Sequence, residues 1–192
     1  MGGHEGAYAW WETVEGPSLY EGDLFIGIEL YIPRTPSSAP PTAIPLDARL
    51  FNLIVMTQSC DIENSKVSNL LLCPWWDLWS WVDAGAASGV NTGSKIRDEL
   101  RKGNVPGYHL LNEASQEGMS IGMGVVDFHE VHTATVAHVR EFATGCGQRL
   151  RLKPPYREHL SQAFARFFMR VGLPVDIPKE KVTNRPSHTP FA

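Results

Sequence analysis

The sequence predicts a mainly β fold of the α+β class that ends in an amphipathic helix. Several short runs rich in branched and aromatic residues are separated by glycine and proline, which is typical of strands joined by turns. Near the C-terminus, apolar side chains recur at spacings of three and four, which is typical of a helix packed on a core. Hydrophobic residues make up 43% and charged residues 20% of the 192 residues, which excludes a disordered, collagen-like or coiled-coil protein.

The first half of the chain contains three expected strands. They cover residues 22–32, 50–57 and 67–73, and Pro74 is expected to stop the third. Residues 33–45 hold five prolines and are expected to form a surface loop. The polar segment 58–65 is expected to be a turn.

The second half mixes short strands and helices. We expect helices at 95–102, 135–142 and 156–171, and strands at 108–111, 121–131 and 149–153. The stripe of the last helix consists of Tyr156, Leu160, Ala163, Phe164, Phe167, Phe168 and Val171. Residues 1–173 are interpreted as one domain and the Pro-rich residues 174–192 as an extended tail.

Charge is unevenly distributed along the chain. The net charge of −4 argues against a protein that coats nucleic acid with uniform positive charge. Residues 1–139 carry 7 Lys and Arg against 17 Asp and Glu, a balance of −10, and residues 140–192 carry 10 against 4, a balance of +6. The two parts therefore have the charge to attract each other, or the basic part has the charge to bind a partner.

The expected compartment is the cytoplasm. The three cysteines, Cys60, Cys73 and Cys146, are an odd number and do not indicate a disulfide framework. The N-terminal residues lack a basic region followed by an apolar run, and no apolar run is long enough to cross a bilayer. We therefore predict a soluble protein without a membrane partner.

The order of the elements resembles the PemK/MazF-like toxin family, whose fold is an SH3-like barrel with a C-terminal helix. A strand introduced by Gly22-Asp23 opens the chain, Leu53–Thr57 supplies the buried strand, and Leu71–Pro74 supplies a strand that ends in proline. Late in the chain, Val125–Phe128 is followed by a short helix and a last helix that closes in Val171-Gly172-Leu173. The resemblance implies that the Trp-rich segment at about 77–107 is an insertion.

The same resemblance implies metal-independent RNA cleavage, in which an Arg stabilises phosphate charge and a His or Asp moves a proton. The Arg-Pro pair that leads into the buried strand in ribonucleolytic members is missing here, because the nearest arginine, Arg49, is followed by Leu50. The hydroxyl that usually follows the strand-ending proline is replaced by Trp75. The candidate catalytic residues are Arg49, Thr57, Cys60, Asp61 and His129.

The Gln58–Asp61 segment offers a different chemistry. Cys60 follows a buried strand and would be a nucleophile if a base lowered its pKa. His109 and His129 are the first candidates for that base, because both lie near expected strands. Alternatively, Asp61 orders the turn and Cys60 is a small buried residue. The spacing of cysteines and histidines is not diagnostic of a metal site, so we expect neither a metal nor a cofactor.

The basic C-terminal part is the candidate nucleic-acid interface. Arginine binds phosphate with two parallel hydrogen bonds, and a neighbouring tyrosine can stack on an unpaired base. Two alternatives are that these arginines solvate a helix face or pair with the acidic part of the chain. The candidate RNA-binding residues are Arg149, Arg151, Lys153, Tyr156 and Arg157.

The tryptophan cluster is the candidate protein interface. Trp75, Trp76, Trp79 and Trp81 are four of the six tryptophans and fall within seven residues. Burial in a core is the ordinary interpretation of such residues, and an exposed docking surface is the alternative.

Three functions follow from these observations. The first is a bacterial toxin-like or defence-associated module that engages RNA or an antitoxin-like protein, with divergent endoribonuclease activity as its enzymatic form. The second is a non-catalytic adaptor that docks through the tryptophans and the proline-rich loop and forms a homodimer. The third is a hydrolase that depends on Cys60.

Overall fold

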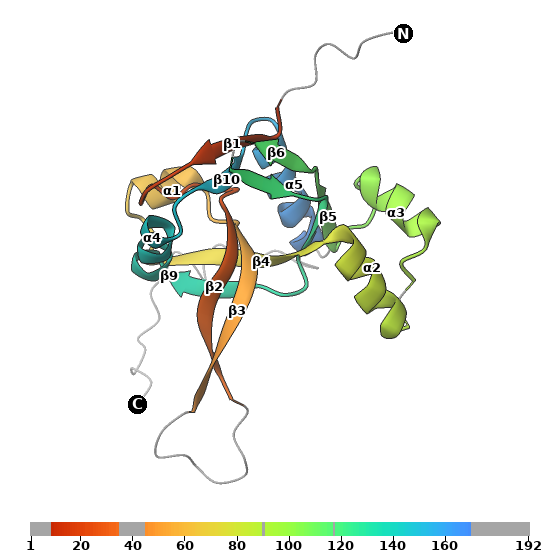
Figure 1. Ribbon diagram of the computed structural model, residues 1–192, viewed down its shortest axis with the longest axis horizontal. Helices are drawn as coiled ribbons and strands as arrows, with labels where there is room; N and C mark the ends of the chain where they lie inside the picture. Colours follow the sequence, from red (N-terminus) through yellow and green to blue (C-terminus); the bar gives the residue numbers. More distant parts are fainter. Residues whose placement is uncertain (1–8, 35–44, 90, 117, 170–192) are drawn as a thin grey trace, which may run out of the picture.

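The computed structural model describes residues 9–34, 45–89, 91–116 and 118–169. It confirms the α+β class, because antiparallel strands and five helices alternate along these residues. Figure 1 shows the strands in the middle, with one pair of helices, α2 and α3, at one side and α1 and α4 at the other. The expected tail at 174–192 and the expected end of the last helix at Val171-Gly172 lie outside the described residues.

The largest sheet has the order β2-β3-β4-β8-β5, and β9 also pairs with β4. Its strands are β2 (Leu24–Pro33), β3 (Leu46–Val55), β4 (Asn69–Asp77), β5 (Tyr108–Leu111), β8 (Gly124–Asp127) and β9 (His132–Thr135). All its pairings are antiparallel. The three expected strands of the first half are therefore present, and β3 and β4 are longer than expected.

Pro74 does not end its strand, which corrects the sequence-based expectation. On one side of β4, Pro74 lies opposite Leu53 of β3. On the other side, β9 pairs as far as Leu72 and β8 takes over at Trp75. The proline thus lies at the gap between two partner strands, where a missing N–H costs little.

The remaining described strands form two smaller, two-stranded sheets. β1 (Trp11–Val14) pairs with β10 (Arg149–Leu152), and β6 (Ala114–Gln116) pairs with β7 (Met119–Ile121). The β1–β10 pair meets β2 through an isolated bridge between Asp23 and Arg151. The described strands form separate sheets and do not close into a barrel.

Gly22 is required where β10 approaches the start of β2. Its φ is +82°, a conformation that residues with a side chain rarely adopt. A Cβ at this position would lie 2.8 Å from the Cβ of Leu152. The Gly22-Asp23 step therefore brings β10 and its arginines against the start of β2.

Three of the five described helices, α3, α4 and α5, were expected from the sequence. The five are α1 (Ser59–Glu63), α2 (Leu78–Ala87), α3 (Ser94–Arg101), α4 (Val136–Gly145) and α5 (Tyr156–Phe168). The expected turn at 58–65 is instead the single turn of α1. The stripe of α5 is confirmed at Leu160, which is fully buried, whereas Phe168 is exposed and departs from it.

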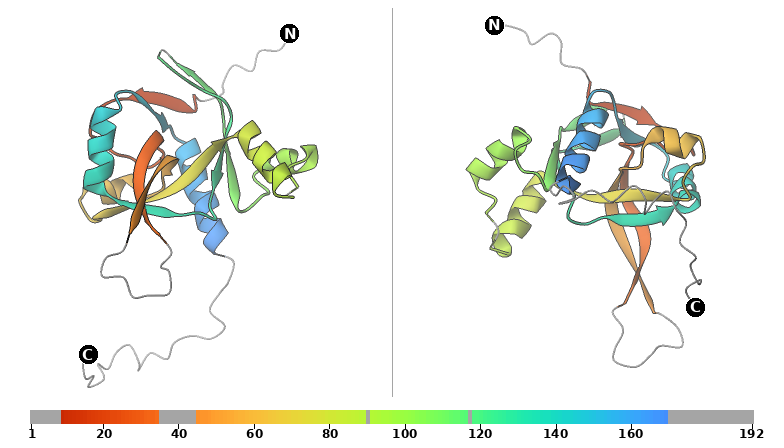
Figure 2. Two further views of the ribbon diagram at one scale, coloured as in Figure 1. Left: turned by 60° about the horizontal axis from the view of Figure 1, so that its bottom comes forward. Right: turned by 180° about the vertical axis from the view of Figure 1, so that it is seen from behind.

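The β2–β3 hairpin extends away from the rest of the molecule as a twisted arm (Figure 2). Tyr31, Leu46 and Leu50 are exposed on it. Direct cross-strand partners share a face, and Tyr31 lies opposite Ala48, between Leu46 and Leu50 on β3. One face of the arm therefore presents exposed apolar side chains, with Glu29 opposite Leu50 as a charged residue on the same face.

Candidate functional site: a basic, aromatic cleft

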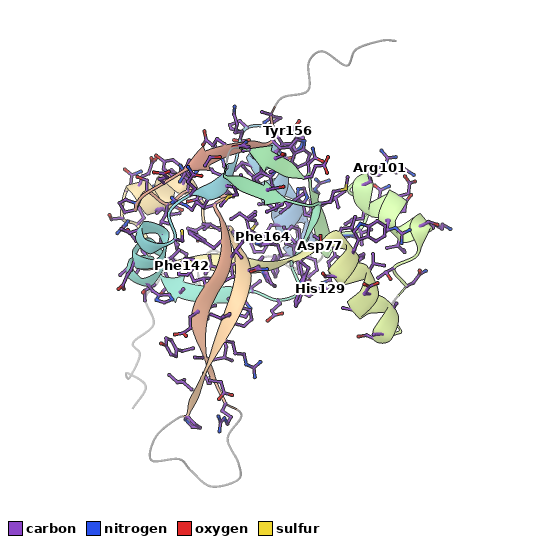
Figure 3. All side chains as sticks on the ribbon, viewed as in Figure 1. Asp77, Arg101, His129, Phe142, Tyr156 and Phe164 are labelled. Carbon is purple, nitrogen blue, oxygen red and sulfur yellow. The ribbon has the colours of Figure 1, made fainter. Side chains whose placement is uncertain are left out.

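A cleft of about 1120 Å³ lies between the α2–α3 pair and α5. One wall comes from α2, α3 and the loop that follows α3, the other comes from α5, and β5 contributes the residues between them. Its size is slightly above the range of about 300–1,000 Å³ that is typical of ligand pockets. In Figure 3, Arg101 on α3 and Tyr156 at the start of α5 mark the two sides.

Local sequence explains how α2 is held as a wall. α2 begins directly after β4, and Asp77 caps it by accepting hydrogen bonds from the backbone N–H groups of Trp79 (2.9 Å) and Ser80 (3.0 Å). Trp81 is buried and contacts the ring of Tyr108 edge to face. α2 is therefore fixed to both β4 and β5.

Two further contacts hold α3 and α5 in place. Leu100 of α3 is buried in a cluster with Leu78, Trp81 and Val125. Leu160 of α5 belongs to the central core, which holds the other wall. Both helices are thus anchored by apolar residues, and Arg97 and Arg101 of α3 and Arg166 of α5 reach the cleft.

Cations and aromatic rings line the cleft together with aliphatic side chains such as Leu78, Leu100 and Met123, and none of the described lining residues is a carboxylate. The basic residues are Arg97, Arg101, Lys102 and Arg166. The rings are Trp10, Trp79, Tyr108 and Tyr156, and two histidines, His109 and His159, add imidazoles. Such a lining attracts anions and provides stacking surfaces.

The four cations differ in their partners. Arg101 and Lys102 form ion pairs on the surface of α3 with Asp98 and Glu99. Arg97 donates to the carbonyl of Thr92 (2.9 Å), and Arg166 donates to the carbonyl of Gln162 (3.3 Å). Within the described part of the chain, neither Arg97 nor Arg166 forms an ion pair with a carboxylate, so both keep positive charge for a ligand.

Two aromatic groups flank the cleft. Trp10 and Tyr156 stack with ring centroids 3.8 Å apart and an interplanar angle of 12°. On the opposite wall, Trp79 is 60% exposed and the guanidinium carbon of Arg97 lies 5.4 Å from its ring centroid. A planar ligand therefore finds rings on both walls.

His109, expected from the sequence as a possible base for Cys60, instead lines the cleft. It lies on β5, and burial lowers its pKa to about 4, with a further contribution from the nearby charges of His159 and Arg166. The imidazole is therefore neutral at pH 7. Its Nε2 is buried and has no hydrogen-bond partner among the described residues.

Of the predicted RNA-binding residues, Arg149 and Arg151 do not face a ligand, which corrects the expectation from sequence. Both are buried, and their guanidinium groups bind the fully buried carboxylate of Asp23. The Nε of Arg149 lies 3.1 Å from Asp23 Oδ2, and Nη2 of Arg151 lies 2.9 Å from the same oxygen. The basic C-terminal part is thus partly neutralised by the acidic part of the chain.

Backbone carbonyls complete this buried network. Arg149 donates to the carbonyl of Gly16 (2.9 Å) and Arg151 donates to that of Ser18 (2.8 Å). The ring of Tyr20 covers the guanidinium of Arg151 at 4.2 Å. The arginines therefore join β10 to the start of β2 and to the segment before it.

Of the other three predicted RNA-binding residues, only one lines the cleft. Tyr156 lines the cleft. Arg157 forms an ion pair with Glu158 at 3.0 Å and does not line the cleft. Lys153 is half-buried, and its backbone N–H donates to the carbonyl of Trp10 (2.8 Å).

The five predicted catalytic residues are not brought together. Arg49 is exposed on the β2–β3 arm, and Thr57 accepts a hydrogen bond from the backbone of Leu71 (2.7 Å) after β3 ends. Cys60 and Asp61 lie on α1. Apart from a 3.8 Å contact between those two side chains, no hydrogen bond or ion pair in the described ranges joins any two of the five.

Two of these residues have surroundings that bear on their chemistry. The thiol of Cys60 contacts Gln58 and Asp61, and no histidine is among its hydrogen-bond partners in the described residues. His129 has an Asp127 carboxylate 2.7 Å from its Nδ1. A Cβ on Gly107 would lie 2.0 Å from Cε1 of His129, so that glycine makes room for the ring.

The tryptophan cluster is divided between the core and the cleft. Trp75 and Trp81 are buried, and the indole of Trp75 donates to the carbonyl of Phe25 (3.2 Å). Trp76 and Trp79 are exposed, and of these only Trp79 lines the cleft. A single docking surface made of all four is therefore wrong.

Metal-binding geometry and membrane-spanning length were also considered. Within the described residues, no cluster of three or more His, Cys, Asp or Glu side chains is arranged to hold a metal ion. Burial, with the nearby charge of Asp127, raises the pKa of the Cys73 thiol to about 12. No helix in the described ranges has both the length and the apolar character to cross a membrane.

The chain was compared with models of known protein families, with curated proteins and with solved structures. None of the three comparisons gives a match.

Proposed function

We propose that the cleft binds single-stranded RNA and that the protein is a toxin-like or defence-associated RNA-binding module. The observation that carries this proposal is the lining of the cleft, in which cations and aromatic rings occur together and no carboxylate occurs among the described residues. Phosphates pair with arginine and lysine, and unpaired bases stack on aromatic rings. A duplex would not offer the faces of its bases for such stacking.

The arrangement of the charges supports an extended, phosphate-bearing ligand. Arg97 lies on one wall and Arg166 lies on the other, and neither is neutralised by a carboxylate of the described chain. Two separated cations suit successive phosphates of one strand. The volume of about 1120 Å³ exceeds the usual range for a single small ligand.

The proposal includes a divergent, open form of the PemK/MazF-type SH3-like fold as the origin of the β2-β3-β4 part, because the described strands do not close into a barrel. Support comes from the Gly22-Asp23 turn, the buried end of β3 at residues 53–55 and the C-terminal helix, which follow one another in that order. The proposed binding surface, however, includes the helix pair α2–α3 within the Trp-rich segment. RNA cleavage, if present, would use the cleft and not the scattered candidates Arg49, Thr57, Cys60 and Asp61.

The test measures binding of a fluorescein-labelled single-stranded RNA of about ten nucleotides by fluorescence anisotropy. Arg97→Ala and Arg166→Ala are each expected to weaken binding about tenfold, because each loses a charge-assisted hydrogen bond to phosphate. Each is also expected to reduce the slope of log affinity against log salt by about 0.7, the value for one phosphate contact in single strands.

Arg140→Ala is the matched control, because Arg140 is exposed on α4 and does not line the cleft. Its RNA affinity should equal that of the wild type. Affinity that is unchanged in both cleft variants, or an absence of RNA binding, would contradict the proposal. Electrophoresis of the same RNA after incubation in EDTA separates metal-independent cleavage from binding alone.

A second candidate function is protein docking through the β2–β3 arm, because its apolar face with Tyr31, Leu46 and Leu50 is exposed. An isolated apolar face of this kind often marks a protein interface. A lack of RNA binding, combined with a dimer in sedimentation equilibrium that Leu50→Asp converts to a monomer, would favour this function.

A further inference from the structure

His109 differs from the other polar residues of the cleft in its depth. It lies on β5 between the two walls, and its ring packs against Phe128 with centroids 6.4 Å apart and an interplanar angle of 24°. Its Nε2 is buried and lacks a hydrogen-bond partner among the described residues. Buried polar atoms normally have a partner, so Nε2 would gain the hydrogen bond that it lacks if a group of a bound ligand reached it.

The charge state of His109 determines which part of a ligand it suits. Burial and the neighbouring charges of His159 and Arg166 keep the imidazole neutral at pH 7. A neutral imidazole offers one N–H donor and one acceptor and has no net charge to attract phosphate. Those groups are complementary to the edge of a nucleobase, which also presents donors and acceptors without charge.

The positions of the cations give the ligand an orientation. Arg97 and Arg166 keep their charge on the helices that form the walls, whereas His109 is on the strand between them. Phosphates held by the arginines would leave a base free to point toward β5. Trp79, with one ring face near Arg97, supplies a stacking surface on the way.

We propose that His109 is a specificity-determining residue, whose imidazole hydrogen-bonds the polar edge of one unpaired base inserted into the cleft. This inference rests on the proposed RNA binding and adds base selection to it. A site built to hydrogen-bond a ligand discriminates against ligands that leave the buried group unpaired. The cleft should therefore bind RNA of one base composition more tightly than RNA of another.

The experiment compares wild-type affinities for fluorescein-labelled octamers of adenylate, cytidylate and uridylate. The strongest and weakest should differ by about tenfold, the effect of one hydrogen bond together with the cost of leaving its buried partner unpaired. His109→Phe keeps an aromatic ring of similar size and removes both nitrogens. In that variant, the ratio between the strongest and the weakest octamer affinity should fall below about threefold, while the salt dependence of binding stays unchanged.

His138→Phe is the matched control, because His138 on α4 hydrogen-bonds the carbonyl of Glu29 and does not line the cleft. It should keep the wild-type preference. A preference that survives in His109→Phe would come from stacking and would overturn the assignment of His109. RNA binding without any preference in the wild type would overturn it as well, while leaving the proposed function intact.

A measurement on the wild type tests the role of His109 without requiring that His109→Phe folds. The ¹⁵N chemical shift of His109 Nε2 should move when the preferred octamer is added to saturation and stay constant with the weakest one. An unchanged shift with the preferred octamer would overturn the assignment. A lack of binding to all three octamers would overturn the proposed function itself.

Discussion

Two groups of arginines in this protein have opposite surroundings. Arg149 and Arg151 are buried and share the carboxylate of Asp23, whereas Arg97 and Arg166 line an open cleft and have no carboxylate partner among the described residues. All four are arginines, and the sequence alone does not separate them by function. The difference shows that the partners of an arginine, and not its presence in a basic segment, decide whether it holds the fold or binds a ligand.

The largest expected effect comes from breaking the buried group. Asp23→Asn removes the charge that two buried guanidinium groups share, and leaving a buried charge unpaired costs about 3–5 kcal/mol. The free energy of unfolding, measured by urea denaturation, should fall by about that amount. Asp61→Asn is the control, because Asp61 pairs with Lys66 on the surface at 3.3 Å, and its loss should be below about 1 kcal/mol.

Equal losses in the two variants would mean that the Asp23 network contributes no more than a surface ion pair. That result would remove the distinction between the buried and the open arginines.

The next effect is a pH dependence that originates in the cleft. Because the pKa of His109 is lowered to about 4 in the folded protein, the unfolded chain takes up the proton first as pH falls below the ordinary value of 6.5. The contribution of His109 to the free energy of unfolding is therefore fully present above pH 6.5 and is lost as the pH falls toward 4. The free energy of unfolding should drop by about 3 kcal/mol from this group.

Urea denaturation of the wild type and of His109→Phe at pH 7 and pH 4 isolates this contribution. Other groups that titrate in this range, such as Glu21, whose pKa is raised by burial, affect both proteins. The wild type should lose about 3 kcal/mol more than the variant. The same loss in both would show that His109 is not held neutral in the folded state.

The smallest effect on stability is expected at the open arginines. Arg166→Ala removes an exposed guanidinium that forms no ion pair with a described carboxylate, so the free energy of unfolding should change by less than about 0.5 kcal/mol. Its RNA affinity should nevertheless fall, as proposed above. A loss of stability as large as that of Asp23→Asn would place Arg166 in the structural group instead.

Much of the fold could be predicted from local patterns. The apolar run of β3 and the stripe of α5 with Leu160 are both properties of neighbouring residues. β1 and the β6–β7 hairpin were not predicted, because they are only three or four residues long and depend on partners elsewhere in the chain. Pro74 was misinterpreted for the same reason, since the gap between β9 and β8 is a tertiary feature.

The site could be predicted only in part. Tyr156 and Trp79 were selected for their chemistry and do line the cleft. Arg149 and Arg151 were selected on the same grounds, and their partner Asp23 is more than a hundred residues away in sequence. Arg97 was missed and His109 was selected only as a possible base for Cys60, because their place in the cleft depends on the convergence of α3, β5 and α5.

The junction at Asp77 has a consequence for how a ligand would enter. β4 ends at Asp77 and α2 begins at Leu78, with the cap bonds of Asp77 across the boundary, and Figure 3 shows this residue where the helix pair leaves the sheet. A strand that runs into a helix without connecting residues offers little freedom for a hinge. This end of the wall would therefore present a pre-organised opening, and a ligand would lose little affinity to rearranging it.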